Sequence, residues 1–145
     1  MKLTRRMAGL FSGLVATFAL TLAGASPASA ATWTLEHTPG HPQRICLDPG
    51  EGWPNTYFLV PLHGTWSTTI TAGISDLPPG SYSDGGKIYP SDVDEDDWQY
   101  IGFVHVSIAP APVGDHVATL WASDGTETQT VPVMISFGQD CYPYD

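Results

Sequence analysis

Hydrophobic and polar residues alternate along much of the chain, which is the pattern of strands that bury one face. The alternation is clearest in three runs near the C-terminus, at residues 104–108, 118–122 and 131–137. Pro110 and Pro112 separate the first two runs, and Ser123-Asp124-Gly125 between the second and third is typical of a tight hairpin turn. We therefore predict three strands here, each burying one side.

The preceding part of the chain predicts four further short strands, at 33–37, 44–47, 57–62 and 66–74, and the first of the three runs extends back to residue 99. The nearly continuous apolar run from Tyr57 to Leu62 predicts a central strand that is buried on both faces. Loops are expected at 48–55 and over 81–98, where at most a short strand is expected near 87–89. No segment has a capped 3.6-residue repeat, so the prediction is an all-β, immunoglobulin-like antiparallel sandwich of about seven strands.

The first thirty residues predict a cleaved secretory signal peptide. Lys2, Arg5 and Arg6 precede an apolar stretch over 7–24, and Ala28-Ser29-Ala30 resembles a cleavage site. A membrane anchor is the weaker alternative because polar residues and glycine interrupt the apolar stretch. We expect a secreted, extracellular protein whose single domain spans 31–145.

The cysteine content is consistent with an extracellular protein, and the charge excludes two classes of partner. The net charge is −10, and Arg44 and Lys87 are the only basic residues after position 30 apart from histidine. Nucleic acid and anionic membranes are therefore unsuitable partners. Cys46 and Cys141 are the only cysteines, and an oxidising compartment predicts a disulfide between them.

Three stretches carry a family resemblance. Trp66 to Gly80 (WSTTITAGISDLPPG), Gly85 to Lys87 (GGK) and Ala111 to Gly125 (APVGDHVATLWASDG) resemble a family of small secreted bacterial domains of unknown function. The last third also resembles bacterial immunoglobulin-like and fibronectin-like modules, with His116 at the position of a characteristic tyrosine. The resemblance implies a β-sandwich and secretion, and it implies no catalytic residue.

Aromatic side chains are one candidate binding feature. Flat rings can stack on sugars, and Trp53 and Trp98 lie in predicted loops while Trp121 points away from the apolar side of its strand. Core packing is the competing role for most aromatic residues of a small β domain. These three tryptophans are therefore the candidates for a ligand site.

The acidic stretch after residue 91 is a candidate calcium site. Its closely spaced carboxylates could supply the oxygen ligands that Ca²⁺ prefers, from Asp92, Asp94, Asp96 and Asp97. It is not an EF-hand, since Asp97 and Phe103 stand where that loop needs glycine and glutamate. A solvated acidic loop without a cofactor is the simpler interpretation.

Histidines and catalytic motifs give less support to a site. His37 and His41 are a close pair that could bind a metal with His63, His105 or His116, although prolines and glycine exclude a helix there. No nucleophile elbow, zinc-protease motif, phosphate loop or dinucleotide fingerprint is found. We therefore expect a protein that is not an enzyme.

The sequence predicts function only at the level of class. We expect a monomeric binding module whose most favoured partner is an extracellular protein, such as a hydrolase that it inhibits, recognised through the loop at 48–55 or 81–98. Binding of polysaccharide through exposed aromatics is the first alternative. A small hydrolase is the second, and it would require a polar cleft.

Overall fold

The computed structural model describes residues 31–93, 99–139 and 141, and it has eight strands and one 3-10 turn. These elements are β1 (Trp33–Leu35), β2 (Arg44–Leu47), β3 (Trp53–Gly64), β4 (Ile70–Ser75), β5 (Tyr82–Ile88), η1 (Pro90–Asp92), β6 (Gln99–Ile108), β7 (Gly114–Ser123) and β8 (Thr128–Phe137). The prediction of an all-β domain is confirmed.

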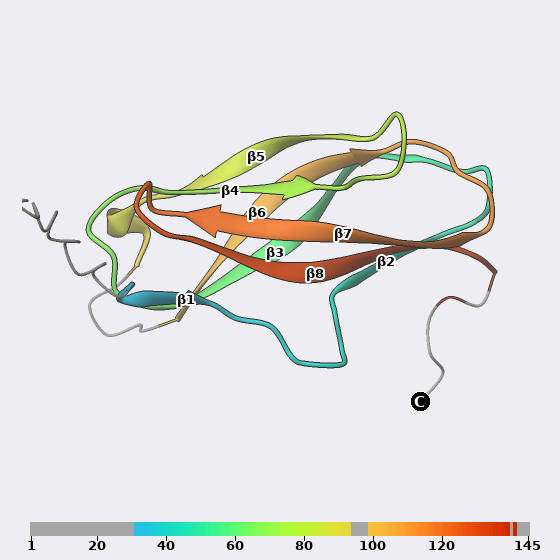
Figure 1. Cartoon of the computed structure of the whole chain (residues 1–145). Coiled ribbons are helices and arrows are strands. Elements are labelled where there is room, and N and C mark those ends of the chain that lie inside the picture. The colour runs from blue at the N-terminus through green and yellow to red at the C-terminus, as the bar shows by residue number, and fades with distance from the viewer. Residues whose placement is uncertain (1–30, 94–98, 140, 142–145) are drawn as a thin grey trace, which may run out of the picture.

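The strands form one sheet in the order β1-β3-β6-β5-β4-β7-β8-β2. Each neighbouring pair is antiparallel except β2 and β8, which are parallel. Figure 1 shows the sheet folded into two layers, with β4, β7 and β8 in front of β3 and β6. The inward residues of both layers form a single hydrophobic core, which includes Phe58, Val104, Leu120 and Ile135.

Strand β5 joins the two layers because it pairs with both. Its first residues pair with β6, and Gly86 to Ile88 pair with β4. Gly85 has a φ of +73°, and a Cβ at Gly86 would collide with the carbonyl oxygen of Phe103. The predicted surface excursion over 81–98 is therefore wrong for 82–88, where glycines that are typical of loops let a strand change partners.

Two glutamine side chains cover strand edges where the layers meet. The carboxamide of Gln43 accepts a hydrogen bond from the Leu59 N–H (2.9 Å) and donates one to the Leu59 carbonyl (2.8 Å). The carboxamide of Gln129 likewise accepts from the Leu35 N–H (2.9 Å) and donates to the Trp33 carbonyl (3.0 Å). Each amide thus occupies the place of a neighbouring strand, and these backbone groups are not left open to another chain.

The N-terminal part of β3 is an edge that no described strand covers on its outer side. It contains Pro54, and its pairing with β6 shifts between Trp53 and Thr56. A proline and a bulge both make an exposed edge unsuitable for pairing with a further strand. This part of the edge is therefore protected against the addition of a further strand.

Three sequence-based predictions differ from the observed strands. Strand β3 begins at Trp53, so that tryptophan lies in a strand and not in a loop. The predicted strand over 66–74 begins only at Ile70. Residues 57–62 are buried on one face only, because the outward neighbours Tyr57, Leu59 and Pro61 are covered by no other layer.

Candidate functional site

The outward side of β3 and β6 carries the most continuous apolar surface that the strand register creates. We call it the β3–β6 face and define it by six outward residues: Tyr57, Leu59, Pro61, Ile101, Phe103 and His105. Leu59 lies opposite Phe103, Pro61 opposite Ile101, and Tyr57 opposite His105. Residues that are directly opposite in a sheet point to the same side, so these side chains form one surface.

Large side chains on this face are exposed to solvent. Tyr57 and Phe103 are each 51% exposed, and Ile101 is 47% exposed. The rings of Tyr57 and Phe103 contact each other edge to face, with centroids 5.2 Å apart. This contact fixes two aromatic rings on a strand pair, and contiguous exposed apolar surface of this kind is typical of an interaction site.

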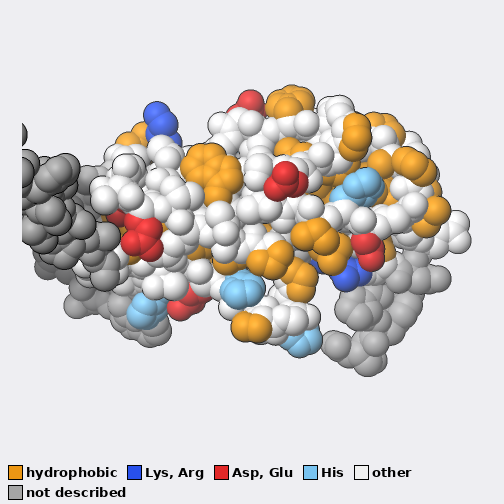
Figure 2. All heavy atoms as spheres, in the orientation of Figure 1, with side chains coloured by type: hydrophobic (Ala, Val, Ile, Leu, Met, Phe, Trp, Pro, Cys, Tyr) orange, Lys and Arg blue, Asp and Glu red, His pale blue; other side chains and the backbone are white. Residues whose placement is uncertain are grey.

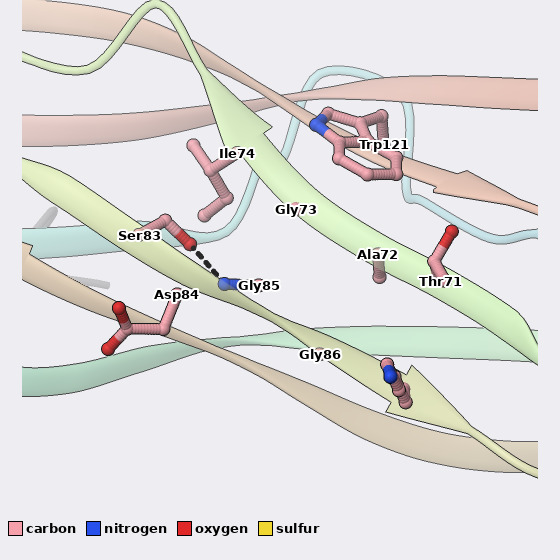
Figure 3. Close-up of a pocket in the computed structure, with 10 residues that line it drawn as sticks. Thr71, Ala72, Gly73, Ile74, Ser83, Asp84, Gly85, Gly86 and Trp121 are labelled. Atoms are coloured by element: carbon pink, nitrogen blue, oxygen red, sulfur yellow. Dashed lines mark hydrogen bonds between the residues drawn. The ribbon is translucent and has the colours of Figure 1, made fainter.

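Carboxylates border the β3–β6 face on two sides. Glu36 lies beside Pro61, to whose carbonyl its N–H donates (2.9 Å), and its carboxylate accepts a hydrogen bond from Gln99 (3.2 Å). Asp84 on β5 precedes Gly85, which lies opposite His105. Figure 3 shows the Asp84 carboxylate directed away from Trp121. The face thus has an apolar centre with acidic groups at its margin.

A second surface feature is a hollow on the outward side of β4, β5 and β7. It has a volume of about 560 Å³, and its lining includes Trp121, Thr71, Lys87, Gly73 and Gly85. Figure 3 shows the Trp121 indole on one side of β4 and the glycines of β5 on the other. The prediction that Trp121 points away from the inward side of β7 is confirmed, because it is half-buried between the buried residues Leu120 and Ala122.

The other two candidate tryptophans have different outcomes. Trp53 is 45% exposed, at the start of β3. Trp98 lies outside the described residues. Tyr57, Ile101 and Phe103 were missed because an apolar residue in a strand is normally assigned to the core. Their signal was the apolar character of the second set of alternate positions in both strands.

The predicted calcium site falls largely outside the described residues, which exclude Asp94, Asp96 and Asp97. Asp92 is described, and its carboxylate accepts a hydrogen bond from the Tyr89 N–H (2.8 Å) at the start of η1. Within residues 31–93, 99–139 and 141, no three His, Cys, Asp or Glu side chains are placed to hold a metal ion.

The histidines lie in separate places. His37 and His41 line a hollow of about 160 Å³ together with Gln43. His105 belongs to the β3–β6 face, whereas the His116 ring contacts Phe137 edge to face at 5.7 Å. The structure therefore brings the predicted pair His37 and His41 together but does not add His105 or His116 to it.

The predicted disulfide is present. Cys46 on β2 is bonded to Cys141, with a Cα–Cα distance of 5.8 Å. The Arg44 guanidinium also donates a hydrogen bond to the Cys141 carbonyl (3.1 Å). The segment that follows β8 is thereby attached to the strand at the far side of the sheet from β1.

One carboxylate has a clearly shifted pKa. The pKa of Asp124 is lowered because its carboxylate accepts hydrogen bonds from the Glu127 N–H, the Trp33 indole and the Thr126 N–H, each at 2.8 Å. These bonds close the β7–β8 turn and attach it to β1. The shift therefore belongs to a structural turn outside both surface features.

A family model matches residues 34–139, which include every strand except the first residue of β1. The chain belongs to this family, DUF5980. The family is described as one of unknown function, so membership assigns no activity.

Other comparisons add little to the family assignment. No curated protein matches the chain. Among solved structures, the chain is similar to the ASH / PapD-like domain of human CEP192 (PapD-like domain 7), with 15% sequence identity and a TM-score of 0.35. That alignment covers 87% of this chain and 95% of the other. In the described part of the chain, no helix has the length and hydrophobicity that crossing a membrane requires.

Proposed function

We propose that this DUF5980 chain is a secreted, disulfide-bonded binding domain that recognises another extracellular protein through the β3–β6 face. The observation that supports it best is the exposure of Tyr57, Ile101 and Phe103 side by side on two paired strands. In this proposal the domain acts by binding its partner and not by catalysing a reaction.

A protein is the partner class that suits this surface. The centre of a protein interface is depleted of charge and enriched in aromatic residues, and the β3–β6 face has both properties. Tyr57 and Phe103 already contact each other, so little conformational freedom remains to be lost when a partner covers them. The strands keep both rings in place before binding.

Charge favours a different protein over a second copy of the chain. The net charge is −10, and Glu36 and Asp84 border the face. Two copies meeting through this face would bring like charges together, which opposes association. The partner is therefore a protein with an apolar surface surrounded by lysine or arginine.

Export supports an extracellular partner. The predicted signal peptide over 1–30 would direct the chain out of the cytoplasm, and the Cys46–Cys141 disulfide is suited to an oxidising compartment. Acidic residues without clustered bases then keep the free domain soluble.

The test is affinity capture from the extracellular proteins of the source organism. The immobilised disulfide-bonded domain is compared with a Tyr57→Ser/Phe103→Ser variant and with Val117→Ser as a control. Val117 is 60% exposed but lies on β7, so the control also loses an exposed apolar side chain. We expect the wild type and Val117→Ser to retain the same basic protein and the double variant to retain at most about a tenth as much.

Retention that is unchanged in the double variant would overturn the β3–β6 face as the binding surface. Loss of the protein from Val117→Ser as well would mean that capture is non-specific. Failure of the wild type to retain any protein would contradict the proposed function itself.

A further inference from the structure

We propose that the hollow between β4, β5 and β7 is a saccharide subsite that takes one pyranose ring of a neutral extracellular polysaccharide. The hollow contains none of the six residues that define the β3–β6 face, although Asp84 at the border of that face also lines it, and it does not depend on the proposed protein partner. It is centred on Trp121, Gly73, Gly85, Thr71 and Lys87, and we call it the Trp121 hollow.

The shape of the Trp121 hollow follows from the strand register. Trp121 lies opposite Gly73, and the pairing of β4 with β5 runs from Ile70 to Ala72, opposite Ile88 to Gly86. Continued by one residue, that register places Gly73 beside Gly85. Two neighbouring outward positions thus lack side chains, which leaves an open hollow of about 560 Å³ on the face of the sheet.

Trp121 supplies an aromatic wall whose position is fixed by Gly73. A Cβ on Gly73 would lie only 2.5 Å from Cζ2 and 2.7 Å from Cε2 of the indole. The ring therefore rests against the bare backbone of β4 (Figure 3). The indole is half-buried, so part of the ring surface remains available. A flat apolar ring of this kind can pack against the C–H groups of a sugar.

Polar groups at the rim match the hydroxyl groups of a sugar. The Thr71 side chain and the Lys87 ammonium lie on β4 and β5, where their residues are directly opposite each other. Both residues are exposed, and Asp84, which carries a carboxylate, lines the same hollow. The Thr71 hydroxyl donates to the Ser123 carbonyl (3.4 Å) and can still accept a hydrogen bond, and Lys87 donates, so a ring stacked on Trp121 has hydrogen-bonding partners within the same hollow.

The charge of the chain selects a neutral sugar over an acidic one. Lys87 is a single cation in a chain of net charge −10, so a polyanionic polysaccharide would be repelled over most of the surface. The open form of the hollow, on the face of the sheet, suits one unit of a long chain better than a small enclosed ligand. A neutral hexose polymer satisfies both conditions.

The test is titration of the disulfide-bonded domain with neutral soluble glucans, mannans and galactans and with an acidic polyuronate, followed by tryptophan fluorescence and calorimetry. We expect at least one neutral polymer to bind and to change the fluorescence. Trp121→Ala should weaken this binding by about tenfold or more, as loss of about 1.4 kcal/mol implies. Trp53→Ala removes another exposed tryptophan and should change the affinity by less than about twofold.

A second variant separates the indole from the space beside it. Gly73→Ala keeps Trp121 but places a methyl group against its ring, so binding should fall while thermal unfolding shows that the domain remains folded. No binding by any neutral polymer would overturn the proposal, as would unchanged binding in Trp121→Ala. Binding restricted to the polyuronate would also overturn the assignment to neutral sugars. Since Tyr57→Ser/Phe103→Ser should leave sugar binding intact, failure here is distinct from failure of the proposed protein interface.

Discussion

The outward sides of the two layers differ although both belong to the same sheet. On the β3–β6 face, the register places Leu59 opposite Phe103 and Pro61 opposite Ile101. On the outward side of β7 and β8, three of the directly opposite pairs contain at least one serine or threonine. They are Ser123–Thr128, Trp121–Thr130 and Thr119–Pro132. One apolar pair, Val117 with Met134, lies nearer the other end of these strands.

The inward pattern determines the fold, whereas the outward pattern is free to differ between the layers, and both proposed binding sites lie on it. Both layers bury alternate residues in the same core, so the fold requires nothing of their outward residues beyond compatibility with a strand. Figure 2, viewed as in Figure 1 with β4, β7 and β8 in front, shows hydrophobic side chains scattered among polar ones. The two consecutive apolar pairs across β3 and β6 are matched across β7 and β8 only by the single pair Val117–Met134.

The largest predicted effect is a difference in the free energy of unfolding between an inward and an outward substitution in β3 and β6. Phe58→Ala removes a side chain that is 2% exposed and should lower the free energy of unfolding by about 3–5 kcal/mol. Phe103→Ala removes a ring of the same type from the outer face and should cost less than about 1 kcal/mol. Chemical denaturation measures both. Equal losses would show that Phe103 has a structural role and would remove the contrast between the faces.

A smaller loss of stability is expected when the glutamine side chain that covers the edge of β1 is removed. Gln129→Ala leaves the Leu35 N–H and the Trp33 carbonyl without the amide that bonds to both, which should cost about 1–2 kcal/mol. Hydrogen exchange at the Leu35 amide should also become faster. Gln139→Ala is the matched control, because Gln139 is exposed and follows β8. If Gln129→Ala behaves like the control, the edge is not held by this amide.

The smallest effect concerns the β7–β8 turn and is confined to acidic solution. Because the pKa of Asp124 is lower in the folded chain, its carboxylate contributes stability that is present above pH about 4 and is lost as the pH falls through the folded-state pKa. Asp124→Asn should therefore reduce the decline in thermal stability below pH 4. It should not alter capture of the protein partner. An unchanged pH profile in Asp124→Asn would contradict the assigned role.

Most of the inward half of this architecture was predictable from the sequence, whereas in the outward half only the direction of Trp121 was. The alternation of Val104, Val106 and Ile108 identified core positions because burial imposes a period of two. The disulfide was predictable because Cys46 and Cys141 had no other cysteine as partner. Strand β5 was missed because Gly85 and Gly86, which allow it to join two layers, are also typical of a turn.

The β3–β6 face was missed for a different physical reason. An apolar side chain at an outward position has the same composition as one in the core, and only the arrangement of layers distinguishes them. Tyr57 and Leu59 were therefore assigned to a doubly buried strand, although no layer covers their outer side. The Trp121 hollow depends similarly on a register that places two glycines side by side on separate strands.

Photocrosslinking from the two outward faces tests recognition through the β3–β6 face most directly. Benzoylphenylalanine is placed at position 103 on β6 or, separately, at position 117 on β7, and each domain is irradiated with the extracellular proteins of the source organism. Recognition through the β3–β6 face should give a specific crosslinked protein from position 103 and none from position 117. The same product from both positions, or a product from position 117 alone, would contradict recognition through the β3–β6 face.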